Sequence, residues 1–231
     1  MVKQERAART REALVRAAAH EFEHTGYEGT SLTRVARAAG ISVGALTFHF
    51  SSKAGLAQAV RTRGDAAVRA CVAEAGAATG TGTAPAFGSA LGGVVDTALD
   101  TALDTALDTV VALTLALARL LERDEVVRAA VRLWRELPDG DGTWSGLWLP
   151  AVAETLDRAG RAGLVPSVGE RDVMLLAEYL LAGAESRLRG RLHRPPGGGE
   201  GVGEGEGEGE GSVERDLSRL WALVLPGLSA R

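Results

Sequence analysis

The stretch from residue 30 to residue 50 constrains the fold of this chain more than any other part of the sequence. Ser31 and Ser42 each stand directly before a short amphipathic segment, where a side-chain oxygen can cap the start of a helix. Gly40 lies between the two segments, at a position where a helix ends in a left-handed conformation. Two short helices joined by a tight turn form a helix-turn-helix, whose second helix enters the DNA major groove. The sequence therefore predicts a DNA-binding helix-turn-helix here.

Helical periodicity gives both of these helices a buried and an exposed face. The first places four apolar side chains on one face, namely Leu32, Val35, Ala36 and Ala39. The second points Leu46 and Phe50 inward, one helical turn apart. At about 100° per residue, its opposite arc carries Gly44, Ala45, Thr47 and Phe48. This arc holds no charge and two small residues, so a DNA groove can approach it closely.

The charge of the chain is divided between a basic front and an acidic remainder. Residues 1–63 carry a net charge of +5 and residues 64–231 a net charge of −9, which together give the net −4 of the whole chain. Lys3, Arg6, Arg9 and Arg11 form a basic cluster just before the helix-turn-helix. Such a cluster attracts DNA phosphates and releases counterions. The alternative is that these side chains only form a solvated helix face.

Several classes of protein are disfavoured by simple counts. The single cysteine, Cys71, excludes an internal disulfide and a zinc site made of several cysteines. The longest apolar run, residues 110–118, is too short to span a bilayer. The N-terminal residues lack the apolar stretch of a signal peptide. We therefore expect a soluble cytoplasmic protein that does not associate with membranes.

The remaining sequence predicts an all-α chain of two domains. Helices are expected at about residues 5–24, 51–75, 87–121, 123–136, 145–162, 170–191 and 212–225. Leu14, Ala18 and Phe22 form the apolar stripe of the first helix, which Gly26 ends. We expect a three-helix helix-turn-helix DNA-binding domain over residues 1–63, with the fourth helix to about residue 75 as a connection. Residues 76–85 look like a loop, and residues 76–231 form the larger ligand-binding and dimerisation domain.

Two segments of simple sequence carry no evident function. The words Asp-Thr-Ala-Leu occur three times over residues 96–107, which indicates a helix lengthened by duplication, with its aspartates forming a solvated ridge. Residues 197–211 consist of Gly and Glu with one Val, and such a segment is expected to be disordered. His20 and His24 lie four residues apart, but no third ligand is evident in the sequence, so we expect two solvated histidines. We predict no metal and no cofactor.

The last two predicted helices have the pattern of an oligomer interface. One carries the stripe Leu217, Leu220, Trp221, Val224 and Leu228, and the other carries Leu180, Ala184 and Leu188 beside Ala182-Gly183. Two such helices from each of two subunits make a four-helix bundle. The alternative is an intrachain core. Because helix-turn-helix dimers bind two half-sites, we favour a homodimer.

Residues 9–60 resemble the DNA-binding domain of TetR-family repressors. The words from Gly44 to Lys53 are similar to those of the γ-butyrolactone receptors of actinomycetes, as are residues 191–195 and 220–228. The resemblance implies an all-helical homodimeric repressor that binds a palindromic double-stranded DNA operator. It also implies that a small signal binds the C-terminal domain and releases the operator.

From the motif and the resemblance together we expect a defined set of DNA-binding residues. They are Thr30, Ser31, Thr33, Arg34, Ser42, Val43, Gly44, Ala45, Thr47, Phe48, His49 and Lys53. Lys53 begins a helix, where a phosphate also meets backbone N–H groups; the alternative for it is a solvated surface lysine. The family usually has Lys at the position of Val43, Tyr at that of Thr47 and Glu at that of Ala54. These differences predict a different operator or weaker binding.

Three tryptophans are candidates for lining the signal pocket, namely Trp134, Trp144 and Trp148. By resemblance, Trp148 takes the position that lines the pocket in the receptors, and an indole offers a flat wall and one N–H donor. Core packing is the alternative. The effector is expected to be a γ-butyrolactone or a related butenolide, or otherwise an antibiotic or biosynthetic intermediate. We find no catalytic constellation, because His49 suits a phosphate contact and Cys71 lacks an activating neighbour, so we predict that the chain is not an enzyme.

Overall fold

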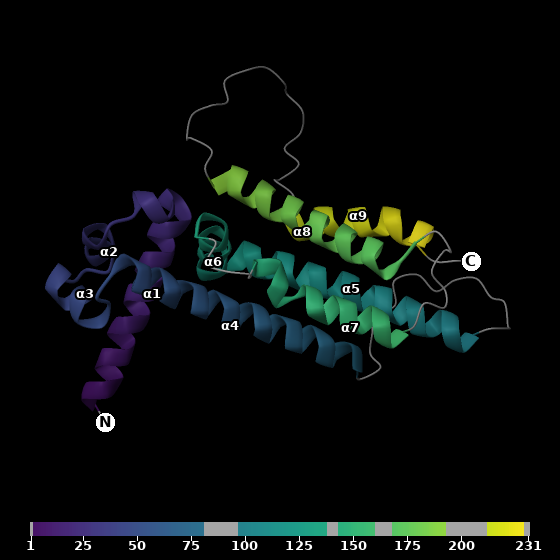
Figure 1. The fold of residues 1–231 in the computed structure, drawn as a ribbon, viewed down its shortest axis with the longest axis horizontal. Helices are drawn as coiled ribbons and strands as arrows, with labels where there is room; N and C mark the ends of the chain where they lie inside the picture. The colour runs from purple at the N-terminus through teal and green to yellow at the C-terminus, as the bar shows by residue number, and fades with distance from the viewer. Residues whose placement is uncertain (1, 81–96, 138–142, 160–167, 193–211, 229–231) are drawn as a thin grey trace, which may run out of the picture. The chain divides into compact units, whose positions relative to one another are not determined.

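The computed structural model describes residues 2–80, 97–137, 143–159, 168–192 and 212–228. Over these residues the fold is all-α, as predicted, and no strand is present. The α-helices are α1 (Val2–Gly29), α2 (Leu32–Ala38), α3 (Val43–His49), α4 (Lys53–Gly80), α5 (Thr97–Arg123), α6 (Glu125–Glu136), α7 (Leu149–Ala159), α8 (Glu170–Leu192) and α9 (Val213–Leu228). A 3-10 helix covers Trp144–Leu147 (Figure 1).

The contacts divide the chain into two compact units. Unit 1 is made of Met1–Arg69 and Arg123–Leu147, and unit 2 of Ala70–Glu122 and Trp148–Arg231. Unit 1 therefore includes α6, which the sequence analysis assigned to the range 76–231. This division reflects how the helices pack and says nothing about what each unit binds. The DNA-binding and ligand-binding domains therefore stay predictions.

The core of unit 1 joins the helix-turn-helix to α1, α4 and α6. Leu14 and Phe22 of α1, Leu46 of α3 and Leu56 of α4 are fully buried in one cluster, together with Leu133 of α6. The apolar faces predicted for the first helix and for the helix-turn-helix are confirmed by this cluster. Because α6 contributes to the same core, it belongs to the framework that holds α3 in place.

Local hydrogen bonds fix the ends of α2 and α3. The Ser31 Oγ accepts from the Arg34 N–H at 3.3 Å, and the Ser42 Oγ accepts from the Ala45 N–H at 3.1 Å. Gly40 has φ 69°, which confirms the predicted left-handed turn. The Ile41 N–H then reaches back across Gly40 to the Ala36 carbonyl at 3.0 Å. The sequence features that predicted this motif therefore act through bonds between residues close together in the chain.

Gly26 interrupts α1 at the place where the sequence predicted its end. Its φ of 73° and ψ of 179° are not helical, although the helix assignment continues to Gly29. A Cβ on Gly26 would lie 2.7 Å from both Arg132 Nη2 and Glu136 Oε1. The next N–H, that of Tyr27, donates to Glu136 Oε2 at 2.6 Å. Gly26 is thus required both by its conformation and by the close approach of α6.

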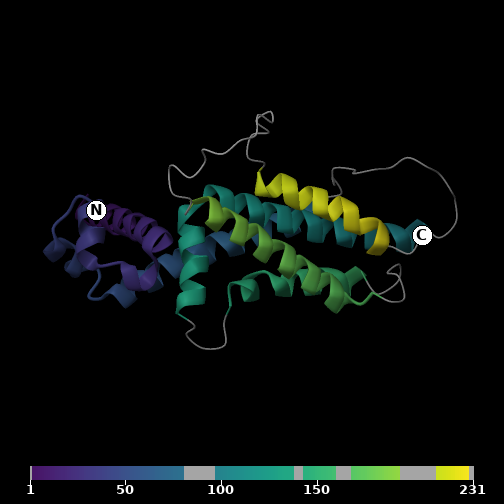
Figure 2. The same ribbon diagram turned by 90° about the horizontal axis from the view of Figure 1, so that it is seen from above.

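Within unit 2, α8 packs against α7 and α9, and α9 also contacts α5. Both ribbon views show α9 beside α5 (Figures 1 and 2). The buried Trp221 Nε1 donates to the Thr114 Oγ1 at 2.9 Å. The Glu122 carboxylate accepts from the Ser212 hydroxyl at 2.9 Å and also from the Val213 N–H, so it caps the start of α9.

The stripe that we expected at an oligomer interface lies mainly inside the chain. Leu217, Trp221 and Leu228 are buried, so the alternative of an intrachain core holds for them. The exposed side of these helices is offset from that stripe and carries Leu220 and Leu223. The periodicity found the amphipathic helix, but it did not tell an intrachain partner from a second subunit.

Two predicted boundaries were wrong. α4 continues to Gly80, so residues 76–80 are helical although we predicted a loop there. The single helix expected over residues 145–162 is a 3-10 helix followed by α7, which begins at Leu149. Pro150 explains this break, because proline fits the first turn of a helix but not its interior.

Several predictions fall on residues that the structure does not describe. They are the helix over residues 87–96, the loop over 81–85, the end of the helix at 160–162 and the disorder of 197–211. Within the described part of the repeat, residues 97–107 are helical and form the start of α5. None of the helices in the described ranges is long and apolar enough to cross a membrane.

Candidate nucleic-acid interface

The outer face of α3 is exposed and uncharged. Gly44, Ala45 and Thr47 are exposed, and the Phe48 side chain is 85% exposed. On the other side of the helix, Leu46 is fully buried. The structure therefore brings the predicted arc of α3 to the surface and fixes it through one buried leucine.

The residues predicted around α2 differ in their exposure. Ser31, Thr33 and Arg34 are exposed, and Arg34 Nε donates to Glu21 Oε2 at 2.8 Å. Thr30 is only 3% exposed, and its hydroxyl donates to the Gly26 carbonyl at 2.7 Å. The side chain of Thr30 thus supports the end of α1 instead of facing outward. We leave it out of the proposed interface.

Lys53, at the first position of α4, is held in a defined place. Its ammonium donates to the Tyr27 carbonyl at 2.8 Å and lies 4.2 Å from the centre of the Tyr27 ring. A half-buried, anchored lysine is not the solvated surface residue of the alternative interpretation. Because an ammonium has three N–H donors, the bond to Tyr27 leaves capacity for a phosphate.

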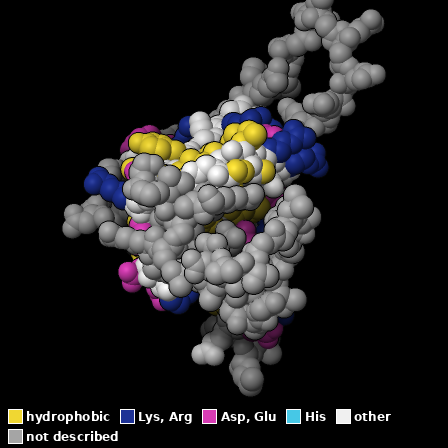
Figure 3. Space-filling model, turned by 90° about the vertical axis from the view of Figure 1, so that its right-hand side faces the viewer, with side chains coloured by type: hydrophobic (Ala, Val, Ile, Leu, Met, Phe, Trp, Pro, Cys, Tyr) yellow, Lys and Arg dark blue, Asp and Glu magenta, His cyan; other side chains and the backbone are white. Residues whose placement is uncertain are grey.

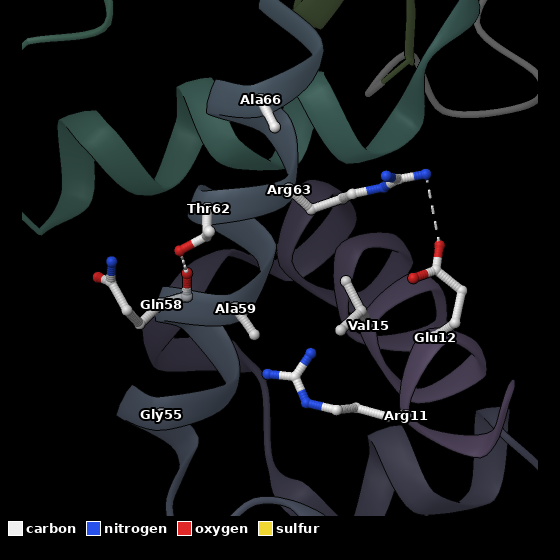
Figure 4. A pocket seen from close by; sticks show the side chains of 9 residues that line it. All are labelled: Arg11, Glu12, Val15, Gly55, Gln58, Ala59, Thr62, Arg63 and Ala66. Atoms are coloured by element: carbon white, nitrogen blue, oxygen red, sulfur yellow. Dashed lines mark hydrogen bonds and ion pairs between the residues drawn. The ribbon is translucent and has the colours of Figure 1, made fainter. Parts of the chain in front are cut away.

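Further cations lie on α1 and α4 around an open cleft of about 340 Å³ (Figure 4). Arg11 and Arg63 line it from the two helices, and Arg63 Nη2 lies 3.7 Å from the Glu12 carboxylate. The Arg11 guanidinium also stands 4.8 Å from the centre of the Phe50 ring, next to the end of α3. Arg9 is exposed and pairs with Glu5 at 2.6 Å. The basic charge predicted from the sequence is therefore at the surface of unit 1.

His49, the last residue of α3, is half-buried. Its ring meets that of Phe48 edge to face, with centroids 5.4 Å apart. This contact lies beside the exposed arc of α3.

The three candidate tryptophans do not share one unit. Trp134 belongs to unit 1, where its Nε1 donates to Asp65 Oδ1 at 3.0 Å and the Arg61 guanidinium lies 3.7 Å from the centre of its ring. Trp144 is half-buried in the 3-10 helix, also in unit 1. Trp148 is fully buried in unit 2, where we predicted the pocket. Of the three, only Trp148 lies in unit 2, and the role of any of them in a signal pocket stays a prediction.

Two titratable groups of unit 2 have raised pKa values. Burial raises the pKa of the Glu185 carboxyl to about 7. Burial, followed by the charge of Glu74, raises the pKa of the Cys71 thiol, while Arg119 acts in the opposite direction. A thiol with a raised pKa is a poor nucleophile, so Cys71 lacks the activation that a catalytic cysteine needs.

Sequence reasoning missed one group of potential metal ligands. His20 and His24 of α1 meet Glu125 of α6, and one ligand atom of each lies within 4.8 Å of the others. Glu125 is 105 residues away from His20 along the chain, so no local spacing could have revealed it. Only a prediction that α6 packs on α1 could have placed Glu125 beside the two histidines.

Comparisons with known proteins agree with this geometry. Residues 14–60 match the model of the family described as bacterial regulatory proteins, tetR family. The A-factor receptor protein of Streptomyces griseus is 45% identical over 60 residues, which make up 26% of this chain and 22% of that protein. The match thus takes in less than a quarter of that relative.

Solved structures extend the likeness along the chain. A γ-butyrolactone receptor described as ArpA-like has 24% identity and a TM-score of 0.62, with 97% of this chain and 90% of that one covered. The TetR-family protein CprB of Streptomyces coelicolor, solved with its operator sequence, has 23% identity and a TM-score of 0.64, with 97% and 90% covered. At these identities the structures establish a shared fold, with a helix-turn-helix followed by a larger helical domain.

Proposed function

We propose that this chain is a TetR-family regulator of the butyrolactone-receptor type and that it acts as a ligand-responsive transcriptional repressor. In this proposal a homodimer binds a palindromic operator, and a γ-butyrolactone or a related butenolide releases it. The matched family consists of regulatory proteins and not of enzymes. The cytoplasm is the compartment in which such a protein meets DNA.

The exposed and uncharged face of α3 is the observation that carries the proposal. Small residues at positions 44 and 45 let the helix backbone approach base edges, while Phe48 offers apolar contact. In this proposal Arg34 and Lys53 contact phosphates of the DNA backbone. The proposed contact set is Ser31, Thr33, Arg34, Ser42, Val43, Gly44, Ala45, Thr47, Phe48, His49 and Lys53.

An apolar face on α8 and α9 supports the proposed dimer. Tyr179 is 73% and Leu223 is 79% exposed, and Leu175 and Leu220 are also exposed. The space-filling view shows hydrophobic side chains on the surface in its upper part, where α8 and α9 lie in Figure 1, beside basic ones (Figure 3). Large apolar side chains gathered on two packed helices are typical of a helix-bundle interface.

The DNA-binding part of the proposal is tested by binding at several salt concentrations. The purified chain should bind fragments of its own promoter region, with an affinity that falls linearly on a log–log plot against salt. Footprinting should then locate two half-sites about one helical turn, or a multiple of it, apart. An affinity for DNA that does not change with salt, or the absence of DNA binding at low salt, would contradict the proposal.

The ligand part rests on Trp148. The expectation from sequence is that Trp148→Ala leaves operator binding intact and abolishes release. Since Trp148 is fully buried, that change also costs about 3–5 kcal/mol of stability. Trp148→Phe keeps an aromatic ring and removes the N–H, so it tests the contact with less damage to the core. Trp134→Phe, in unit 1, is the matched control.

The readout is release of a labelled operator, combined with a thermal-shift screen. Butyrolactones and butenolides form one arm, and antibiotics with their precursors form the other. Release by a butyrolactone that Trp148→Phe weakens, and that Trp134→Phe does not, is the expected result. Release by antibiotics alone would replace the proposed effector and leave the DNA-binding function standing.

A further inference from the structure

A cluster of two histidines and one glutamate joins α1 to the first residue of α6. His20 Nδ1 lies 2.6 Å from Glu125 Oε1. The rings of His20 and His24 are neighbours, with centroids 4.3 Å apart. The cluster lies wholly within unit 1. We propose that His20, His24 and Glu125 bind a divalent transition-metal ion of the Zn²⁺ class, which ties α1 to α6.

The spacing of the ligand atoms fits such an ion. The donor atoms of the three residues lie within 4.8 Å of one another. With metal–nitrogen and metal–oxygen bonds of about 2.1 Å and tetrahedral angles, donor atoms on one Zn²⁺ ion are about 3.4 Å apart. The widest pair must therefore approach by about 1.4 Å. The side chains of His20 and Glu125 are 55% and 36% exposed, so small rotamer adjustments can close this distance.

The histidine tautomer at His24 is already the one that a metal needs. Its Nδ1 lies 2.8 Å from the His20 carbonyl oxygen, which can only accept a hydrogen bond. Nδ1 therefore carries the proton, and in the neutral ring the lone pair is on Nε2. Metal-binding histidines are commonly fixed in this way by a bond from the second ring nitrogen to a carbonyl or carboxylate.

The packing of α1 on α6 holds the three residues in place. The Asp124 Oδ1 caps α6 by accepting from the Val126 and Val127 N–H groups at 2.8 and 3.2 Å, which fixes the position of the next residue, Glu125. One turn further along both helices, Glu23 pairs with Arg128 in a largely buried ion pair. Glu23 and Arg128 pair with each other, and the carboxylate of Glu125 faces the histidines.

Two imidazole nitrogens and one carboxylate oxygen form a donor set that binds Zn²⁺, Ni²⁺ and Cu²⁺ more tightly than Mg²⁺ and Ca²⁺. Because the cluster is at the surface, water completes the coordination. An ion there adds bonds between α1 and α6 without passing through the proposed signal pocket. The inference does not depend on the proposed function, since it concerns the binding of metal by unit 1.

The test is a titration of the full chain with Zn²⁺, in parallel with Mg²⁺. We expect binding of one Zn²⁺ per chain and a rise in Tm, with no comparable effect of Mg²⁺. His20→Gln, His24→Gln and Glu125→Gln should each weaken the Kd for Zn²⁺ at least about tenfold. Glu28→Gln, at an exposed glutamate of the same helix, and Cys71→Ser should leave it unchanged.

Cu²⁺ binding followed by electron paramagnetic resonance provides a readout that is independent of variant stability. Hyperfine coupling from two imidazole nitrogens is expected in the unaltered chain. No Zn²⁺ binding up to millimolar concentration, or binding that survives in the double variant His20→Gln/His24→Gln, would overturn the proposal. Equal binding of Mg²⁺ would do the same, because it points to unspecific acidic residues such as those of segment 197–211.

Discussion

Two exposed surfaces of this protein, the outer face of α3 and the apolar face of α8 and α9, differ in the partner they suit. On α3 the exposed arc combines small residues with one aromatic ring, Phe48, and has Arg34 and Lys53 in the same unit. On α8 and α9 the exposed residues are large and apolar, such as Tyr179 and Leu223. Exposure alone therefore does not identify a partner. Side-chain size and nearby charge distinguish a face for a DNA groove from one for a second subunit.

The largest effect is expected where a charge enters the α8–α9 face. Leu223→Glu places a carboxylate in the proposed interface, where burial without a partner is costly. We expect a monomer in light scattering and a loss of operator affinity of more than about 100-fold, since one protomer contacts a single half-site. Ala222→Glu is the matched control, because residue 222 is exposed on another side of α9. A Leu223→Glu variant that remains dimeric would assign this face to another partner.

A charge on α3 should separate DNA binding from assembly. Ala45→Asp puts a carboxylate against the groove and its phosphates, so operator affinity should fall by about 100-fold, or nearly 3 kcal/mol. The dimer and the Tm should be unchanged, because residue 45 is exposed. Ala73→Asp adds the same charge at an exposed position of α4 outside the proposed contact set. Equal losses from both variants would mean that net charge, and not the α3 face, determines binding.

Adding a cation to α3 should have a moderate and opposite effect. Val43 is 40% exposed at the first position of α3, where the resembling family usually has Lys. In a dimer, Val43→Lys should steepen the salt slope by about 1.8 and raise operator affinity roughly tenfold. Val43→Gln, with similar length and no charge, should change neither. Fluorescence anisotropy at four or more salt concentrations measures both quantities.

The smallest effect concerns the stability of unit 2. Burial raises the pKa of Glu185 from 4.5 to about 7, so the folded state disfavours the carboxylate. The stabilisation that comes from this raised pKa is fully present below the pKa of Glu185 in the unfolded chain. It is lost as the pH rises through about 7, the pKa in the folded chain. Glu185→Gln should therefore stabilise the chain by about 1 kcal/mol at pH 8, allowing for solvent screening and for Arg189 nearby, and by little at pH 4. Glu154→Gln, at an exposed position, should show no such pH dependence in thermal unfolding.

The parts of the fold that could be predicted are those that depend on neighbours in sequence. Ser31, Gly40 and Ser42 determine the helix-turn-helix through bonds that span a few residues, and all three predictions are confirmed. The stripe containing Trp221 was recognised, but its partner, Thr114, is 107 residues away. Burial of that stripe within the chain was therefore beyond what periodicity can tell.

The candidate sites also divide into features that depend on neighbours in sequence and features that depend on distant residues. The exposed arc of α3 was located correctly, because a helix with one buried leucine has only one other side. Thr30 was expected among the DNA-binding residues, but its side chain is buried and its hydroxyl bond to the Gly26 carbonyl depends on the break in α1, which the sequence does not reveal. Trp134 and Glu125 acquire their contacts from the packing of α4 and α1 against α6. That packing is tertiary, and no local spacing encodes it.

The break at Gly26 has a consequence for genetics. Any side chain there meets both an unfavourable φ and the ends of Arg132 and Glu136. A screen for derepressed alleles should therefore recover substitutions at codon 26 alongside those in α3, although residue 26 would touch neither operator nor inducer. Second-site changes to shorter side chains at positions 132 and 136 should restore function only in part, because they remove the close contact and leave the unfavourable φ.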